Sequence, residues 1–239
     1  MEAKDRRTEL RAAVNRGDGL AVVGLAERWL GSDDALQLLG DGLLAALAHH
    51  VGEAPKLAAE CARRLRQRGW DGDDDLADQL DAGAGVRAHP MLRPLPVDLE
   101  ELAMLLEGDG FGGGGRIDRQ TGEIWTEAAI EYAEEQGEDL DTDDEDRWLW
   151  VGPEGSADGY RDMQAFIATV TDPSRADRLE IAIDGNGAFR RFKDVLGRWP
   201  EELERWFVYS EERQRGRART WLTDAGYYPS PGPGSSPRQ

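Results

Sequence analysis

Cysteine and long apolar runs are nearly absent from this sequence. Cys61 is the one cysteine among 239 residues, so no intramolecular disulfide can form and a thiolate-based zinc site would lack ligands. The longest apolar stretch, residues 43–48, is far shorter than the roughly 20 residues that a helix needs to cross a bilayer. The first eleven residues contain no apolar core of signal-peptide length. We therefore expect a cytoplasmic protein in a reducing compartment, with no membrane partner.

The sequence also lacks the patterns of known catalytic sites. Its three histidines, His49, His50 and His89, do not form the HExxH motif of a helical zinc site. No serine stands in a nucleophile elbow, and no Walker sequence for binding phosphates occurs. We therefore assign no catalytic, cofactor-binding or metal-ligating residue and expect no cofactor.

Acidic residues, by contrast, are abundant. The chain has 48 Asp or Glu against 29 Lys or Arg, a net charge of −19. Residues 185–239 depart from this pattern: they hold 10 basic and 7 acidic residues, a balance of +3, whereas the rest holds 19 and 41, a balance of −22. Because so acidic a chain is repelled by phosphate backbones, we expect weak or no binding of nucleic acid.

Residues 1–80 have the apolar spacing of helices. Leu36, Leu39 and Leu43 mark one such segment. We predict a helical region over 1–80, a candidate surface for a protein partner, and a linker over 81–95, where glycines and prolines interrupt the pattern. A short echo of Trp29 and its neighbours recurs 41 residues later at Trp70. It fits either a two-helix repeat or an ordinary bundle.

Residues 96–228 mix strand and helix patterns. Two short strand patterns flank a loop that ends in Gly122, as a hairpin turn with a positive-φ position requires. We predict strands at 115–118, 123–126 and 147–151, and helices at 97–106, 127–136, 160–170, 188–199 and 211–225. The predicted fold class is α+β, a helical N-terminal region followed by a small antiparallel sheet packed with C-terminal helices. The proline-rich tail, residues 229–239, is expected to be disordered.

Four stretches of this C-terminal part carry a family resemblance. They are residues 117–124 (IDRQTGEI), 159–167 (GYRDMQAFI), 187–196 (GAFRRFKDVL) and 218–222 (ARTWL). On these the chain resembles the bacterial family of unknown function that is numbered one-five-eight in the UPF series. The resemblance implies one domain over about residues 96–228 and leaves residues 1–95 outside. It brings no activity, cofactor or catalytic residue.

A dense acidic run occupies residues 131–146, with ten carboxylates and no basic residue. Within it, Asp139, Asp141 and Asp143 have the spacing that begins a calcium loop, but Asp144 stands where that loop needs glycine and Trp150 where it needs glutamate. We predict a solvated loop. Weak binding of a hard cation by so many carboxylates stays open.

The segment 187–199 supplies the candidate site. At 100° per residue, Phe189 and Phe192 fall on one helical face with Val195, Leu196 and Trp199, and Arg190, Arg191 and Arg198 fall on the other. The candidate residues for an anionic or protein partner are Arg190, Arg191, Lys193 and Arg198. The alternative interpretation is a solvated surface that balances an acidic protein. Further on, Arg213, Arg215, Arg217 and Arg219 split into two helical rows. If the helix is continuous, a second buried stripe would hold Leu203, Phe207, Ala218, Trp221 and Leu222.

The function remains unknown at this point, and two hypotheses compete. The leading one is a non-catalytic binding or regulatory module that engages a protein or an anionic partner. The alternative is a metal-dependent enzyme acting on a phosphate ester, in which carboxylates hold metal ions beside Arg190, Arg191 and Lys193.

Overall fold

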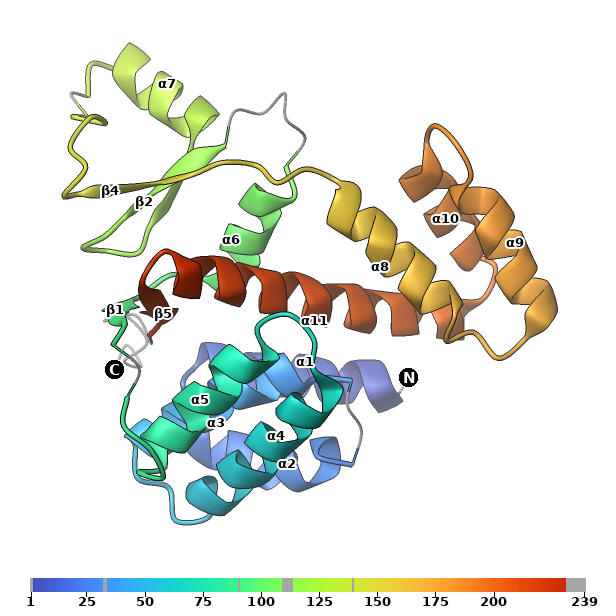
Figure 1. Ribbon diagram of the computed structural model, residues 1–239, viewed down its shortest axis with the longest axis horizontal. Helices are drawn as coiled ribbons and strands as arrows, with labels where there is room; N and C mark the ends of the chain where they lie inside the picture. The colour runs from blue at the N-terminus through green and yellow to red at the C-terminus, as the bar shows by residue number, and fades with distance from the viewer. Residues whose placement is uncertain (1, 32–33, 90, 109–113, 139, 231–239) are drawn as a thin grey trace.

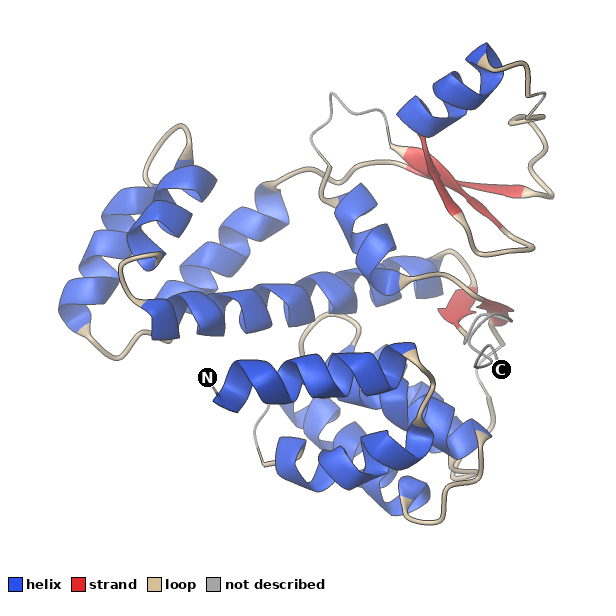
Figure 2. Cartoon of the chain, turned by 180° about the vertical axis from the view of Figure 1, so that it is seen from behind, coloured by secondary structure: helices blue, strands red, loops and turns tan. Residues whose placement is uncertain are grey.

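The computed structural model describes residues 2–31, 34–89, 91–108, 114–138 and 140–230. Figure 1 shows a bundle of helices, α1 to α5, below the long helix α11 (Pro200–Asp224), with the three-stranded sheet and the remaining helices above it and the strands β1 and β5 at one end of it. Figure 2 shows from behind that helices dominate and that the strands gather at one end of the molecule. The predicted α+β class is confirmed, with helices preceding a small antiparallel sheet.

The N-terminal bundle consists of α1 (Glu2–Asn15), α2 (Gly19–Trp29), α3 (Leu36–Ala48), α4 (Ala54–Arg68) and α5 (Asp73–Gly83). Its centre is α3, a helix that is apolar on most sides, as a buried helix must be. Neighbouring helices approach it closely where it has glycine, since a Cβ on Gly40 would meet Leu76 at 2.5 Å. Cys61 is buried beside α3, and this burial raises the pKa of its thiol.

The three-stranded sheet has the order β3-β2-β4 and is antiparallel throughout. Its strands are β2 (Gly115–Asp118), β3 (Ile124–Thr126) and β4 (Trp148–Val151), so all three predicted strands are found. Gly122 closes the hairpin with φ +74°, a conformation that glycine adopts without steric cost. The helix α6 (Leu99–Leu106) precedes the sheet in the sequence, and α7 (Glu127–Glu135) lies between β3 and β4.

A second, two-stranded ladder was not predicted. β1 (Arg93–Leu95) pairs in parallel with β5 (Tyr227–Pro229), which joins the start of the C-terminal part to its end. Both strands have only three residues, too few for an alternating pattern to stand out. Pro229, predicted as the first residue of the disordered tail, belongs to β5. Residues 231–239 of that tail lie outside the described residues.

Within the described ranges, four helices follow β4: α8 (Ala157–Ile167), α9 (Pro173–Ile183), α10 (Ala188–Leu196) and α11 (Pro200–Asp224). The prediction was wrong about the start of α11, which begins at Pro200 rather than near residue 211 and runs for 25 residues. Proline at the first helical position and acidic residues in the first turn are ordinary start signals. The helix α11 contacts both the N-terminal bundle and the helices of the C-terminal part.

The backbone of α11 touches the bundle at a pair of glycines. A Cβ on Gly216 would lie 2.1 Å from the carbonyl oxygen of Asp71, and a Cβ on Gly72 would lie 2.3 Å from that of Gly216. Gly72 also has φ +72°, so two constraints favour glycine there. This contact sets how closely α11 can approach the loop between α4 and α5.

Candidate binding cleft beside the C-terminal helices

The arginines of α11 lie in a network of ion pairs, and one of the two rows faces the N-terminal bundle. Arg219 is fully buried and donates to the side-chain oxygens of Gln37 at 2.9 Å and Gln79 at 3.1 Å. It also pairs with Asp41. Arg215 pairs with Asp41 at 3.5 Å and with Glu100 at 3.1 Å. This row therefore has its partners inside the protein.

The other row is paired as well. Arg213 and Arg217 both reach the buried carboxylate of Asp162, at 2.9 and 2.7 Å. Arg217 also contacts Glu107 at 2.6 Å. Burial acts to lower the pKa of Arg217, but the carboxylates of Asp162 and Glu107 outweigh it, and the net direction is upward. The guanidinium thus stays charged, and its charge is matched inside the fold.

Acidic side chains at the contact between α11 and the bundle are engaged in the same way. The carboxylate of Glu212 accepts from the backbone N–H groups of Gln37 at 2.8 Å and Leu38 at 3.2 Å, which lie at the start of α3 and need acceptors. Arg68 pairs with Glu212 at 3.1 Å and with Asp73 at 2.7 Å. Over the described residues, no group of three or more His, Cys, Asp or Glu side chains is arranged to hold a metal ion.

The structure places the four candidate residues of α10 and its end differently from one another. The side chain of Arg190 is 90% exposed, with only a loose 3.9 Å approach to Asp194. Arg198 is also exposed, just beyond the last turn. Lys193 points into a cleft described below. Arg191 does not share this exposure.

Arg191 connects α10 to the end of α9 through hydrogen bonds. Its guanidinium donates to the carbonyl oxygens of Ala182 at 3.0 Å and Gly185 at 3.2 Å, and also to those of Asp184 and Asn186. These carbonyls belong to the end of α9 and to the following turn, where a helix leaves acceptors unsatisfied. Arg191 therefore has a structural task that its position in the sequence does not reveal.

The cleft lies between α10 and α11 and has a volume of about 450 Å³. Two aromatic rings are partly open to solvent there: Phe189 is 38% and Phe207 is 49% exposed. We call this hollow the α10–α11 cleft; its lining residues are Glu107, Gly159, Phe189, Lys193, Trp206, Phe207, Ser210, Glu211 and Gln214. Gly159 on α8 makes room for Phe189, because a Cβ there would lie 3.0 Å from the ring.

The charges around this cleft are unequally satisfied. Glu107 is held by Arg217 and by Gln214, each at 2.6 Å, and Glu211 is held by Arg7 at 2.6 Å and by Arg11. Lys193 forms no ion pair within the part of the chain that the structure describes. The unmatched charge at the cleft is therefore positive, although the whole chain is strongly acidic.

Sequence reasoning missed the cleft. It placed Phe207 with Leu203 on a buried stripe of a continuous helix, whereas the structure leaves Phe207 49% exposed at the cleft. Leu203, Trp206 and Phe207 follow at helical spacing behind the proline, a signal that could have extended α11. Phe189, predicted on the apolar stripe, instead stands at the edge of the cleft, while Phe192 is fully buried against Trp206 with ring centres 4.8 Å apart.

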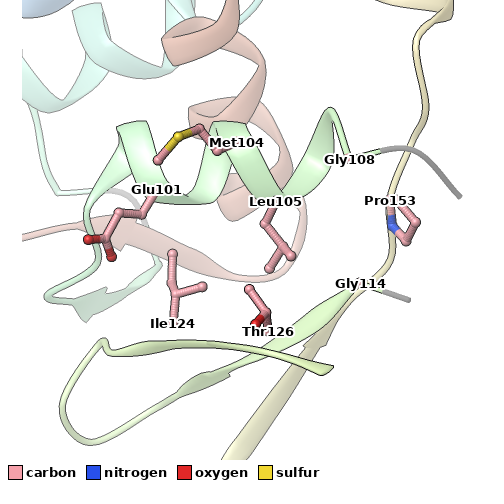
Figure 3. Close-up of a pocket in the computed structure, with 8 residues that line it drawn as sticks. All are labelled: Glu101, Met104, Leu105, Gly108, Gly114, Ile124, Thr126 and Pro153. Carbon is pink, nitrogen blue, oxygen red and sulfur yellow. The ribbon is translucent and has the colours of Figure 1, made fainter. Parts of the chain in front are cut away.

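A second hollow of about 440 Å³ lies between α6 and the sheet. Figure 3 shows Met104 and Leu105 of α6 on one side, with Ile124 and Thr126 of β3 opposite them. Met104 is 70% exposed. Glu101 is the charged residue of its described lining, so this hollow, unlike the α10–α11 cleft, has no basic residue in its described lining. Gly108 and Gly114, which also line it, flank residues 109–113 in the sequence, and those five residues lie outside the described ranges.

These features define an α+β domain with a short antiparallel sheet, a long C-terminal helix and a cleft, attached to a helical bundle. The chain belongs to the uncharacterised protein family UPF0158, whose sequence pattern matches residues 93–230. It is similar to the UPF0158 protein PA5073 of Pseudomonas aeruginosa, with 29% identity over 139 residues, which cover 58% of this chain and 89% of the relative. No solved structure matches the chain. The resemblance seen in the sequence is thus confirmed, and the function of the family is unknown.

The extent of the match separates the bundle from the family domain. Since 139 matched residues make up 89% of the relative, that protein has no room for a counterpart of the 92 residues that precede the match here. The bundle therefore lies outside the part of the chain that matches the family. None of the helices in the described ranges is both long and apolar enough to cross a membrane.

Proposed function

We propose that this protein is a non-catalytic binding module and that the α10–α11 cleft engages an acidic segment of a protein partner. The observation that carries the proposal is the pairing of two partly exposed phenylalanines, Phe189 and Phe207, with the unpaired Lys193 in one cleft. Aromatic side chains in a concave surface are typical anchors for a partner's apolar side chain. The lysine supplies the charge that an adjacent carboxylate would need.

Charge complementarity supports an acidic partner. Residues 185–199 hold four basic residues, Arg190, Arg191, Lys193 and Arg198, against Asp194, a balance of +3. Arg191 is occupied by the turn after α9, which leaves three cations facing solvent. Long-range repulsion by the acidic remainder disfavours a polyanion such as nucleic acid, whereas a short segment with one or two carboxylates meets mainly the local positive field.

Site-directed crosslinking tests this proposal in two steps. A photoreactive phenylalanine analogue at position 207 should crosslink one predominant partner in cells, and mass spectrometry would identify the crosslinked segment. A synthetic peptide of that segment is then titrated against purified variants. Lys193→Glu should weaken binding by about tenfold or more, as expected for reversal of an interfacial charge.

The chain offers matched controls for both contacts. Lys56 on α4 is exposed and lies in the bundle, so Lys56→Glu makes the same change of charge elsewhere and should leave the affinity unchanged. Phe207→Ala removes the aromatic contact and should also weaken binding of the peptide. Leu20 is 74% exposed, so Leu20→Ala is its control and should leave the affinity unchanged. Equal affinities of Lys193→Glu and Lys56→Glu would contradict the proposal, as would a crosslinked segment without acidic residues.

A further inference from the structure

A separate pocket lies where the bundle meets the end of the chain. Its volume is about 350 Å³, at the lower end of the range for small-molecule sites, about 300–1,000 Å³. Leu44 and Leu47 of α3 and Tyr228 of β5 supply apolar walls, and Gln79, His50 and His89 supply polar groups. We call it the bundle–strand pocket. It shares no lining residue with the α10–α11 cleft.

Gln79 carries an unsatisfied donor at this pocket. Its side chain is only 6% exposed, and its amide nitrogen has no hydrogen-bond partner among the described residues. Its amide oxygen accepts from Arg219 at 3.1 Å, which fixes the orientation of the amide. Because a buried donor without a partner is costly, such a group is explained well by a ligand that accepts from it.

The position of His50 points the same way. It has φ +54°, and it is the one non-glycine residue with positive φ in the described ranges. It directly follows the cap of α3, where its N–H bonds to Leu47 at 3.0 Å. Helices usually place glycine at this left-handed position, because other residues pay a steric cost there. A histidine that bears this cost and lines a pocket suggests a role for the imidazole at its rim.

We propose that the bundle–strand pocket binds a small, largely apolar molecule that presents a carbonyl or carboxylate oxygen to the amide nitrogen of Gln79. The apolar walls would enclose the body of such a ligand, with the two histidines at the entrance. Since the walls come from α3, α5 and β5, an occupied pocket ties the bundle to the family domain. Ligand binding would therefore stabilise their contact.

Saturation-transfer NMR with three simple probes tests the proposal on the full-length protein. Benzoate and benzamide carry the required oxygen, and toluene has the ring without it. We expect signals from benzoate or benzamide. Tighter binding of benzoate would indicate an acidic ligand, and tighter binding of benzamide a neutral one. Absence of binding by both, or equally tight binding of toluene, would overturn the proposal.

Gln79→Glu is the decisive variant. It keeps an oxygen for Arg219 to donate to, but it replaces the amide donor with an acceptor. We expect the binding of the oxygen-bearing probe to weaken by roughly tenfold or more, because the hydrogen bond is replaced by a repulsive contact. Gln164→Glu, an exposed residue of α8, is the matched control and should bind like the unaltered protein. Equal binding by both variants would contradict the assignment.

A second variant tests the pocket without touching the amide. Ala48 lines the pocket and is exposed at the end of α3, so Ala48→Phe should fill the space while the melting temperature stays close to that of the unaltered protein. Loss of probe binding in this folded variant supports the site. Unchanged binding would place the probes elsewhere and overturn it.

Discussion

Helices α10 and α11 both contain arginines, and Arg190 on α10 and Arg219 on α11 have opposite environments. The Arg190 side chain on α10 is 90% exposed, whereas Arg219 on α11 is fully buried. α11 runs against a bundle that offers Asp41 and Asp71. Other carboxylates that its arginines reach are Asp162, Glu100 and Glu107. The comparison shows that an excess of basic residues in a sequence does not by itself mark a binding face, since burial decides which charges are free.

The largest expected effect is at the buried end of this comparison. Arg219→Met removes the partner of Asp41, Gln37 and Gln79, and it leaves buried acceptors unsatisfied. Loss of one member of a buried ion pair costs about 3–5 kcal/mol. Urea unfolding followed by circular dichroism should show a lower midpoint, and the free energy of unfolding should fall by that amount. Arg198→Met, at an exposed site, should change the free energy of unfolding by less than about 0.5 kcal/mol.

A similar loss is expected on the buried face of α10. Phe192 is fully buried between Phe166 and Trp206, so Phe192→Ala should leave a cavity and cost about 3–5 kcal/mol. Phe189→Ala, three residues earlier at the edge of the cleft, should cost less than about 1 kcal/mol and reduce only partner binding. Thermal unfolding of both variants checks this, and equal destabilisation would show that Phe189 belongs to the core.

A smaller effect is expected where α11 meets the bundle. In Gly216→Ala the new methyl group would lie 2.1 Å from the carbonyl oxygen of Asp71, and such overpacking costs about 1–3 kcal/mol. Gly24→Ala is the control, because nothing lies within 4 Å of its Cβ position in α2. It should stabilise the protein by up to about 1 kcal/mol through helix propensity. Calorimetric melting should therefore move in opposite directions for the two variants.

The elements that the sequence predicted are those whose signals are local. The hairpin could be predicted because Gly122 marks its turn, and α10 could be predicted because its apolar spacing is regular. The hydrogen bonds and the ion pair of Arg219 could not be predicted from the sequence. Its partners Gln37, Asp41 and Gln79 are 182, 178 and 140 residues away along the chain. The structural role of Arg191 could not be predicted for a different reason. Arg191 donates to backbone carbonyls, and because every residue has one, no residue type in the sequence marks the contact.

The division of the chain is itself a prediction for the same comparison. We expect residues 93–230 to fold without the bundle, because this part has its own apolar clusters around Leu102 and Phe166. In that fragment Arg219 would be hydrated rather than paired, so Arg219→Met should then have little effect on stability. A cooperative thermal transition of the fragment checks the first point. An equally large loss from Arg219→Met in fragment and full chain would contradict the second.

The smallest effect separates two neighbours on α10. Arg191→Met removes hydrogen bonds to the carbonyls that end α9, and we expect a loss of about 1–2 kcal/mol. Arg190→Met should lie within about 0.5 kcal/mol of the unaltered protein, because a loose, exposed ion pair contributes little. Urea unfolding distinguishes these values. Identical midpoints would mean that Arg191 does not hold the turn.

Arginine-selective labelling tests most directly the claim that α10 offers free charge while α11 does not. The folded protein is treated with phenylglyoxal for increasing times, and the modified residues are mapped by mass spectrometry. We predict rapid modification of Arg190 and Arg198, slower modification of Arg191, and protection of Arg215 and Arg219 until the protein is unfolded. Modification of Arg219 as fast as that of Arg190 in the folded protein would contradict the account.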